Sequence, residues 1–409
     1  MSDRKNKAIF LDNASTTAMR METLEAMEPY FLEDYGNPSS IHSMGRTPRE
    51  ACQRARKTIS YIINAEPEEI FFTSGGTESD NWAITSVARK AGKEKNIVVS
   101  KIEHHAILET AEALEKEGFK IRYVGVDSDG LVDLDELKSL VDEGTALVSV
   151  MTANNEIGTI QPLKEISEIA HAKGALFHTD AVQAMCHIPI DVRDMGIDML
   201  SASGHKFGAP KGIGFLFVRK GVRLDPFMRG GAQEEGKRAG TTNVPGIVGM
   251  GKAAELESAG MARKMREISE MRDHAIERIE KEIPYAKLNG HRERRLPGNV
   301  NFSFRFVEGE SLLMMLNAAG ICVSTGSACA SGSLDPSHVL LAIGLPHEIA
   351  HGSIRMSLSE RNTMEEIDRA VDVLKSSIER LRSMSPLYED YVKKEKCQRC
   401  HTTEYTAIR

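Results

Sequence analysis

Short apolar runs alternate with amphipathic stretches along the first half of the chain. Seven runs of five to seven residues are rich in β-branched and aromatic side chains and are predicted to be strands. They are EIFFTSG (69–75), NIVVS (96–100), IRYVGV (121–126), ALVSVMT (146–152), ALFHTD (175–180), DMLSAS (198–203) and IGFLFV (213–218). Because strands separated by helices form parallel sheets, the pattern predicts an α/β fold with a mainly parallel seven-stranded sheet covered on both faces.

The stretches between these runs have the period of amphipathic helices. Three of them end in a glycine suited to a helix C-cap. They are NWAITSVARKAG (81–92), AILETAEALEKEG (106–118) and LKEISEIAHAKG (163–174). The sequence therefore predicts helices between the strands.

A second pattern begins with a long charged helical stretch over residues 246–282 and continues as a smaller α+β unit. Its expected elements are GNVNFSF (298–304), GESLLMMLNAA (309–319), ICVS (321–324), SIRMSLS (353–359) and a terminal helix over 363–384. We expect a large domain over 16–260, a small domain from 1–15 and 261–385, and a polar tail over 386–409.

Composition and charge narrow the function classes. The chain has 409 residues, a net charge of −7 and a pI of about 6.1. A general nucleic-acid or membrane-surface binder needs a basic footprint, which this balance argues against. The N-terminus shows no signal-peptide pattern and no stretch approaches a membrane span, so we expect a cytoplasmic protein. Six scattered cysteines are then expected to be thiols, with Cys52, Cys186 and Cys322 serving as packing.

Candidate chemistry follows the predicted strands. TSGGTESDN (73–81) places small residues between a strand and a helix, where backbone N–H groups, the helix dipole and the hydroxyl of Thr77 could hold a phosphate. Alone, this turn could equally be a tight connection. Asp180 ends a later strand, and could either cap a helix or pair with a protonated ring nitrogen.

A third element is the lysine in SASGHKFGAPKGIG (201–214). Lys206 lies between Gly204 and Gly208 and is a candidate base or imine-forming nucleophile, although a structural lysine is the alternative. Together, a phosphate seat, a strand-end aspartate and a glycine-flanked lysine are the parts needed to hold pyridoxal 5′-phosphate. The phosphate anchors one end, the lysine forms the imine, and the carboxylate keeps the pyridine nitrogen protonated.

The order and spacing of nine motifs, running over about residues 8–385, resemble the NifS/IscS-type cysteine desulfurases. The motifs are LDNASTT (11–17), GNPSS with His42 (36–42), TSGGTESDN, EHH (103–105), NNEIGTIQP (154–162), HTDAVQ (178–183), SASGHKFGAPKG, RAGTTN (238–243) and STGSACASGSLDPSHVLLAIG (324–344). The resemblance implies the fold of the aspartate-aminotransferase class, with the small domain built from both chain ends.

The resemblance also implies residue roles. Lys206 would form the imine and move protons, His104 would stack on the ring and act as an acid or base, and Asp180 would pair with the ring nitrogen. Asn155 would position cofactor and substrate, and Arg355 would bind the substrate carboxylate, unless it is a surface arginine. The remaining cofactor contacts would come from Gln183 at the ring hydroxyl and, at the phosphate, from Gly76, Thr77, Ser203, His205 and the partner subunit's Thr241. An obligate homodimer is thereby implied.

Cys329 lies in STGSACASGS (324–333), a run of small residues typical of a mobile, exposed loop. The resemblance implies that its thiolate attacks the sulfur of L-cysteine, leaving alanine and a persulfide for an acceptor such as an iron–sulfur scaffold protein. Which acceptor, and whether the role is nitrogen fixation or housekeeping, stays open.

Other functions remain as alternatives. A pyridoxal-phosphate aminotransferase or a selenocysteine lyase would share Lys206 and Asp180, although transamination gives no reason for Cys329. A non-catalytic interaction protein on this fold would not need all three residues. The tail CQRCH (397–401) departs from the family pattern and has haem-attachment spacing, which requires export. A labile metal or redox site formed by Cys397, Cys400 and His401 is the other possibility for that segment, and the catalytic site itself is expected to hold no metal.

Overall fold

The computed structural model of the chain describes residues 8–325 and 336–394. They form two compact units. The larger comprises Asn13–Glu267 and Gly290–Pro297, and the smaller takes its described residues from Met1–Asp12, Ile268–Asn289 and Gly298–Arg409. The domain limits expected from the sequence stay a prediction, since compactness alone does not show that a unit folds independently.

The larger unit contains a seven-stranded sheet with the order β2-β8-β7-β6-β5-β3-β4. Its strands are β2 (Ile70–Thr73), β3 (Asn96–Ser100), β4 (Lys120–Val124), β5 (Thr145–Ser149), β6 (Leu176–Asp180), β7 (Met199–Ser203) and β8 (Gly214–Val218). Five of the seven strands lie wholly within the predicted runs, and β4 and β5 each begin one residue before theirs. Only β8 is antiparallel to its neighbours, β2 and β7, so the other strands of this sheet share one direction. The predicted mainly parallel α/β sheet is confirmed.

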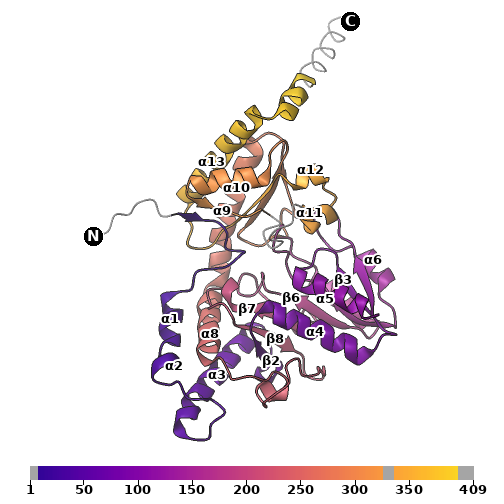
Figure 1. Cartoon of the computed structure of the whole chain (residues 1–409), viewed down its shortest axis with the longest axis vertical. Coiled ribbons are helices and arrows are strands. Elements are labelled where there is room, and N and C mark those ends of the chain that lie inside the picture. Colours follow the sequence, from indigo (N-terminus) through magenta and orange to yellow (C-terminus); the bar gives the residue numbers. More distant parts are fainter. Residues whose placement is uncertain (1–7, 326–335, 395–409) are drawn as a thin grey trace, which may run out of the picture. The chain divides into compact units, whose positions relative to one another are not determined.

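Helices cover both faces of this sheet, as Figure 1 shows. They are α3 (Ser43–Ile62), α4 (Gly76–Ala91), α5 (His105–Lys116), α6 (Leu134–Leu140), α7 (Leu163–His171) and α8 (Val244–Ser258). Alternate strand residues enter different cores: Phe72 and Leu200 pack with α3, α7 and α8, whereas Phe71 and Met199 pack with α4 and α5. This alternation follows from the period of two along a strand, and it explains why the strands read as continuous apolar runs.

Two further predictions concern helix ends. The three glycines expected to end helices, at positions 92, 118 and 174, each have a left-handed φ. The stretch over 246–282 is two helices, α8 and α9 (Met261–Glu282), because Gly260 adopts a φ of 69° between them. The remaining elements of this unit are α1 (Met21–Met27), α2 (Pro29–Leu32) and the 3₁₀ turns η1 (Pro67–Glu69), η2 (Gly204–Lys206) and η3 (Glu234–Gly236).

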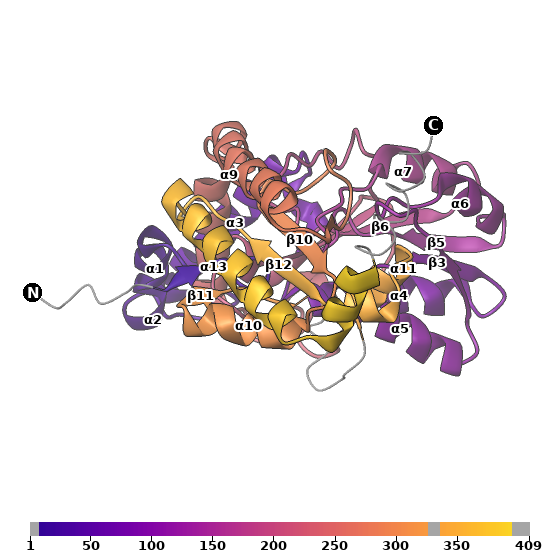
Figure 2. The ribbon, with the colours of Figure 1, turned by 90° about the horizontal axis from the view of Figure 1, so that it is seen from above.

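The smaller unit has its own sheet and core. The strands β12 (Ser353–Ser357), β10 (Asn299–Phe304) and β9 (Ala286–Leu288) are antiparallel, and β1 (Ile9–Phe10) pairs in parallel with β11 (Ile321–Cys322). Its helices are α9, α10 (Gly309–Ala318), α11 (His338–Ala342), α12 (His347–Ala350) and α13 (Met364–Ser383). Figure 2 shows α9 and α13 crossing over β10 and β12, where apolar side chains of these elements share one core.

Residues 386–394 form a further helix that the sequence analysis did not anticipate. Its two tyrosines pack on the smaller unit. The ring of Tyr391 lies 5.0 Å from that of Phe306 and 5.5 Å from that of Tyr285, and Tyr388 lies 5.5 Å from Phe306. The first part of the expected tail is therefore an aromatic-packed helix.

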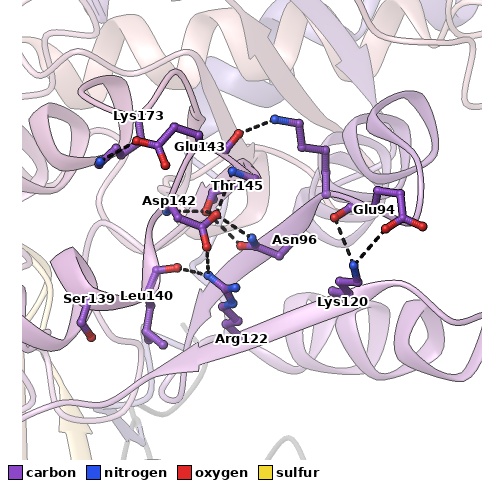
Figure 3. A network of polar contacts seen from close by, with 12 residues as sticks. Glu94, Asn96, Lys120, Arg122, Ser139, Leu140, Asp142, Glu143, Thr145 and Lys173 are labelled. Carbon is purple, nitrogen blue, oxygen red and sulfur yellow. Dashed lines mark hydrogen bonds and ion pairs between the residues drawn. The ribbon is translucent and has the colours of Figure 1, made fainter.

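A polar network joins the starts of β3, β4 and β5, at the edge of the sheet opposite the strand ends discussed below (Figure 3). The Asp142 carboxylate accepts hydrogen bonds from Arg122 (2.8 Å) and Asn96 (3.2 Å), and Asn96 in turn accepts one from the hydroxyl of Thr145 (3.0 Å). At this edge of the sheet the polar side chains pair with one another, and so they hold the three strands together.

Within residues 8–325 and 336–394, no helix combines the length and the apolar character needed to cross a membrane.

Candidate active site

The carboxyl ends of five strands meet at one edge of the large sheet, and the predicted site residues follow them. Open α/β sheets bind ligands at this edge. The residues are Gly76 and Thr77 after β2, His104 after β3, Asn155 after β5, Asp180 and Gln183 at and after β6, and Ser203, His205 and Lys206 at and after β7. The sheet thus brings to one edge residues that lie up to 130 positions apart in the chain.

The turn from β2 into α4 makes a close cradle. Helix α4 begins at Gly76, so its first turn presents N–H groups that have no partner within the helix. A Cβ atom at Gly76 would lie 2.5 Å from Cγ2 of Val182 and 3.6 Å from Cβ of Ser203. Glycine is therefore required for this approach. The helix N-terminus and the Ser203 side chain lie next to each other, as a seat for an anion needs.

An ion pair controls the charge beside this cradle. Glu78, in the first turn of α4, accepts a hydrogen bond from the backbone N–H of Ser74 (2.8 Å) and pairs with Arg238 (2.8 Å). Burial alone would raise the pKa of Glu78, but the hydrogen bonds from Arg238 and Ser74 bring it below its usual value. This contact of Arg238 was not predicted from its motif, RAGTTN.

Lys206 is held by backbone carbonyls. It ends η2, directly after β7, and its Nζ donates hydrogen bonds to the carbonyl oxygens of Ala14 (2.6 Å) and Ser15 (3.0 Å). Gln183 Nε2 donates to the same Ala14 oxygen at 2.9 Å. Lys206 and Gln183 thus share an acceptor on the loop of the LDNASTT motif, a contact that was not predicted.

Two threonines of the same loop fix the turn around Lys206. Thr16 Oγ1 lies 3.1 Å from Nδ1 of His205, and Thr17 Oγ1 donates to the carbonyl oxygen of His205 at 2.9 Å. The backbone N–H of Gly208 donates to Thr17 Oγ1 at 2.8 Å. Burial, followed by the charges of Lys206 and Lys211, lowers the pKa of His205 to about 4, so this imidazole is neutral near pH 7.

His104 caps helix α5. Its Nδ1 accepts a hydrogen bond from the backbone N–H of Ala106 at 3.1 Å, which leaves the proton of the neutral ring on Nε2. Burial, then the charges of Lys206 and His105, lower the pKa of His104 to about 4. His104 and Lys206 are therefore near each other, as expected, and the imidazole is neutral near pH 7.

Asp180 ends β6 with its side chain 5% exposed. Burial raises the pKa of Asp180 to about 6, against the N–H of Val182 and the charge of Lys206, which both lower it. The hydrogen bond from the Val182 N–H to Oδ1 is 2.8 Å long. Residues 181–187 form turns and no helix, so the helix-cap interpretation of Asp180 does not hold.

Asn155 lies half-buried in the loop after β5, beside a residue that fixes this loop. The side chain of Asn154 donates to the carbonyl oxygen of Ile102 (2.9 Å) and accepts from the backbone N–H groups of Glu156 (2.9 Å) and Ile157 (3.0 Å). Asn154 thus joins the Asn155 loop to the segment just before His104. Asn155 was predicted as a site residue, whereas this role of Asn154 was not predicted.

A groove of about 680 Å³ lies along α4 and α5 next to these residues. Thr77 and His104 line one part of it, and Trp82, Phe227 and Arg229 line other parts. The cradle residue Thr77 and the ring of His104 are therefore accessible from one hollow. Lys206 and Asp180 are not among the residues that line this groove, and most of its lining residues are polar or charged.

Arg355 belongs to the smaller unit. It lies in β12 with 3% of its side chain exposed, so the surface-arginine interpretation is wrong. Its Nη2 lies 3.0 Å from Oδ1 of Asp12. Its backbone N–H donates to the carbonyl oxygen of Ser324 (2.7 Å), and the Ser324 N–H donates back (3.1 Å). The start of the segment that carries Cys329 is thus paired with Arg355.

Some of the other predicted residues lie in the part of the chain that the structure describes, and others do not. Thr241 is exposed in the loop before α8, and its neighbours Gly240 and Thr242 line a small hollow together with Thr73, which ends β2, and Ser74 of the turn between β2 and α4. Cys329 and the tail residues Cys397, Cys400 and His401 lie outside the described residues. Cys52 and Cys186 are buried as expected, and burial raises the pKa of Cys52 to about 12, whereas Cys322 is only half-buried.

Comparisons with known proteins agree with this geometry. The family model for class-V aminotransferases matches residues 9–370. The chain is 54% identical to the cysteine desulfurase IscS of Methanosarcina thermophila over 94% of its length and 95% of that protein. It is also 54% identical to the protein of the same name from Clostridium botulinum, over 95% and 98% of the two chains.

Solved structures show the same likeness. A NifS-like protein superposes with a TM-score of 0.85 at 40% identity, covering 90% of this chain and 98% of that one. The NifS-like protein of Rickettsia africae gives 0.82 at 30% identity, over 91% and 99% of the two chains. SspA in complex with cysteine gives 0.76 at 35% identity, over 87% of this chain and 100% of that one.

Proposed function

Because this chain belongs to the class-V aminotransferase family, and within it to the NifS/IscS-type cysteine desulfurases, we propose that it removes the sulfur of L-cysteine with pyridoxal 5′-phosphate as its cofactor. The family depends on that cofactor. The observation that carries the proposal is the position of Lys206, whose amine is held by Ala14 and Ser15 within the electrostatic reach of Asp180 and His104.

The residues at the sheet edge fit the cofactor. The glycine cradle at the start of α4 suits a phosphate, and a Cβ at Gly76 would fill part of it. Asp180 offers a carboxylate for a protonated ring nitrogen, and Lys206 offers the amine that forms the imine. When bound, pyridoxal phosphate supplies an electron sink for negative charge at the substrate α-carbon.

Each side chain then has a task. Asp180 would hold the proton of the ring nitrogen, and Gln183, oriented by Ala14, would donate to the ring hydroxyl. His104 would stack on the ring and exchange protons through Nε2, since its Nδ1 is occupied. Lys206 would accept and return the proton at the substrate α-carbon. Asn155 positions cofactor and substrate.

The phosphate contacts come from the cradle and its surroundings. Gly76 and Thr77 provide the helix N-terminus, and Ser203 and His205 provide side chains next to it. Thr241, which is exposed on the loop before α8, is proposed to reach the phosphate of a partner subunit. The site would then be complete only in a homodimer.

Arg355 is proposed to bind the substrate carboxylate, because a planar guanidinium makes two parallel hydrogen bonds to such a group. Its backbone pairing with Ser324 supports a role near the sulfur step, since Cys329 follows five residues later. The Cys329 thiolate attacks the substrate sulfur. A sulfur–sulfur bond forms as the carbon–sulfur bond breaks, its electron pair stays on the substrate carbon, and a proton there gives alanine.

The persulfide on Cys329 is proposed to pass its outer sulfur to an acceptor, either a scaffold for iron–sulfur cluster assembly or another sulfur carrier.

Exposed apolar side chains support the homodimer. Eight of the fifteen exposed large hydrophobic residues within the described part of the chain lie between positions 21 and 61. Exposed apolar side chains are typical of protein-contact surfaces, so the segment 21–61 is proposed to contribute to the dimer contact. A cytoplasmic location stays a prediction.

The test is to measure alanine and sulfide from L-cysteine with the purified holoenzyme and a thiol acceptor. We expect Cys329→Ala to retain the visible imine absorbance and to lose sulfur release, and Lys206→Ala to lose that absorbance. Cys322→Ala is the matched control, a half-buried thiol of the same unit, and should keep both. Sulfide and alanine released by Cys329→Ala at the rate of the unmodified enzyme would exclude Cys329 as the nucleophile.

A parallel assay separates the second candidate function. A selenocysteine lyase would use the same Lys206 and Asp180 but would act on L-selenocysteine and leave L-cysteine unchanged. Turnover of L-cysteine with alanine as product therefore supports the desulfurase. Turnover confined to L-selenocysteine would replace the proposed substrate, and transamination of L-cysteine without alanine would replace the proposed reaction.

A further inference from the structure

A row of polar side chains crosses the face of the large sheet that α4 covers. Ser149 of β5, His178 of β6 and Ser201 of β7 are fully buried there. Nδ1 of His178 lies 2.8 Å from Oγ of Ser149, and Nε2 lies 3.0 Å from Oγ of Ser201. His178 is two residues before Asp180 on the same strand and therefore on the same face. The three side chains of this row therefore lie beside Asp180 on the same face of the sheet.

His178 is neutral in this setting. Each ring nitrogen already has a serine hydroxyl as its partner, and a neutral imidazole satisfies both with one donor and one acceptor. Burial lowers the pKa of His178 to about 3. His178 therefore supplies no positive charge to the carboxyl groups around it.

Asp80 of α4 faces this row. Its side chain is 1% exposed, and Oδ1 lies 3.8 Å from Nε2 of His178. No hydrogen bond to Oδ1 of Asp80 exists within the described residues. Burial, then the charge of Asp180, raise the pKa of Asp80 well above its usual value; a hydrogen bond with Ser201 opposes this, and Glu103 adds to it. An ionised carboxylate here would be a buried charge beside another carboxylate, which is strongly unfavourable.

Glu103, just before His104, is the third carboxyl group of this region. It is fully buried, and Oε1 accepts hydrogen bonds from the Ser100 hydroxyl (2.6 Å) and the Met151 N–H (2.8 Å). Burial raises the pKa of Glu103 to about 8, and the charge of Asp180 adds to the effect while the two hydrogen bonds oppose it. Below that pH, Glu103 is predominantly protonated.

Three buried carboxyl groups cannot all ionise next to one another. Of Asp80, Glu103 and Asp180, the last is the one whose charge is stabilised by Lys206. We propose that Asp80 and Glu103 are positioning residues that hold protons, so that the whole negative charge of this region stays on Asp180, where the ring nitrogen of the cofactor binds. The protonation of Asp80 and Glu103 does not depend on the proposed function; only the role of the Asp180 charge toward the ring nitrogen rests on it.

Neutral substitutions test the inference directly, because Asp80→Asn and Glu103→Gln copy a protonated acid. The matched control is Asp198→Asn. Asp198 is equally buried at the start of β7 but pairs with Arg219 (3.2 Å) and His171 (2.7 Å). The first measurement is the thermal unfolding midpoint of the apoenzyme from about pH 6 to about pH 9.

The direction of each pKa shift determines how the unfolding midpoint should change with pH. A carboxyl group whose pKa is raised on folding contributes stability that is lost as pH rises through its folded value. The unmodified apoenzyme should therefore lose stability progressively as pH rises toward about 8, where Glu103 ionises, whereas Glu103→Gln should lose less. Asp80→Asn should match or exceed the unmodified midpoint throughout, and Asp198→Asn should lower it throughout. A midpoint lowered by Asp80→Asn and Glu103→Gln as much as by Asp198→Asn would overturn the inference.

The second measurement reports on Asp180 itself. In the holoenzyme, the visible absorbance of the bound cofactor should shift above about pH 8 as Glu103 ionises, and Glu103→Gln should abolish this shift. An identical shift in Glu103→Gln would overturn the link to the cofactor. If a variant fails to fold, infrared spectra of the unmodified apoenzyme should still show the carbonyl band of buried protonated carboxylic acids at about pH 7, and its absence would overturn the inference. Failure to bind pyridoxal phosphate would refute the proposed function and leave the apoenzyme results valid.

Discussion

The backbone carbonyl of Ala14 positions two side chains at once. It accepts hydrogen bonds from Nζ of Lys206 (2.6 Å) and from Nε2 of Gln183 (2.9 Å). Because the acceptor is a main-chain atom, no side-chain substitution at position 14 can remove it, and its place depends on the conformation of the loop. Thr16 and Thr17 secure that conformation through His205. The threonines of this loop therefore support the turn that carries Lys206.

At the same scale, Gly76 tests the phosphate cradle. A Cβ atom at this position would meet Val182 at 2.5 Å, so Gly76→Ala must displace a side chain at the mouth of the seat. We expect the dissociation constant for pyridoxal phosphate to rise about tenfold or more, a loss of about 1.4 kcal/mol. Titration of the apoenzyme with the cofactor, followed by absorbance, measures it.

The control for this substitution is Gly174→Ala, at the end of α7. Gly174 has a φ of 76° and no atom within 4 Å of an added Cβ. This change should cost about 1 kcal/mol of stability through backbone strain and leave cofactor affinity unchanged. Unchanged affinity in Gly76→Ala would show that the phosphate is bound elsewhere.

Residues at strand ends could be predicted from the sequence, whereas residues that act through the sheet could not. Lys206 and Asp180 stand out locally, because each directly follows or ends an apolar run. Asp80 reads as an ordinary polar residue of a helix. Its surroundings come from β5, β6 and β7, more than 65 residues away in the chain. Only the assembled sheet shows that this carboxyl group faces a neutral histidine.

Elements were predictable where their apolar period was strong. The strands of the large sheet, and the helices α4, α5 and α7 that cover it, have continuous or periodic apolar faces, and the structure confirms them. Helix α3 also covers the sheet but was not predicted. The helix over residues 386–394 was missed because its segment, PLYEDYVKK, has few apolar residues. Its partners, Tyr285 and Phe306, lie about eighty or more positions earlier, so only tertiary packing defines it.

This helix supplies a prediction at the scale of an element. Tyr391 packs on Phe306 and Tyr285, and the guanidinium of Arg305 lies 5.0 Å from its ring. We expect Tyr391→Ala to destabilise the docked helix by about 1–2 kcal/mol, since aromatic and cation–π contacts are both lost. Faster hydrogen exchange confined to residues 386–394, measured by mass spectrometry, would show it.

Met314→Ala is the control, because Met314 is 68% exposed on α10, outside the segment 21–61 that is proposed to contact a partner subunit, and its loss should leave exchange over 386–394 unchanged. The cofactor absorbance should be the same in both variants. Unaltered protection of the helix in Tyr391→Ala would mean that Tyr388 and the backbone are sufficient to hold it. The aromatic packing of Tyr391 would then not be what stabilises this part of the chain.

For the whole molecule, the proposed residues are distributed over both parts of the fold. Lys206, Asp180 and His104 belong to the larger unit, and Arg355 belongs to the smaller one. Thr241 is exposed on its loop, which is anchored to the rest of its own unit by the pairs Arg238–Glu78 and Arg56–Glu234. A rigid, exposed threonine suits a contact made with another subunit.

Mixed dimers test whether Thr241 acts across the subunit boundary. Lys206→Ala alone and Thr241→Ala alone should both be impaired, the first in imine formation and the second in cofactor affinity. Co-expressed with different affinity tags, they give a heterodimer that contains one intact site: its lysine comes from the Thr241→Ala subunit and its threonine from the Lys206→Ala subunit. The purified heterodimer should then show about half the activity of the unmodified dimer. Thr241 acting within its own chain would leave both sites defective and restore no activity, and a monomeric protein would yield no heterodimer at all.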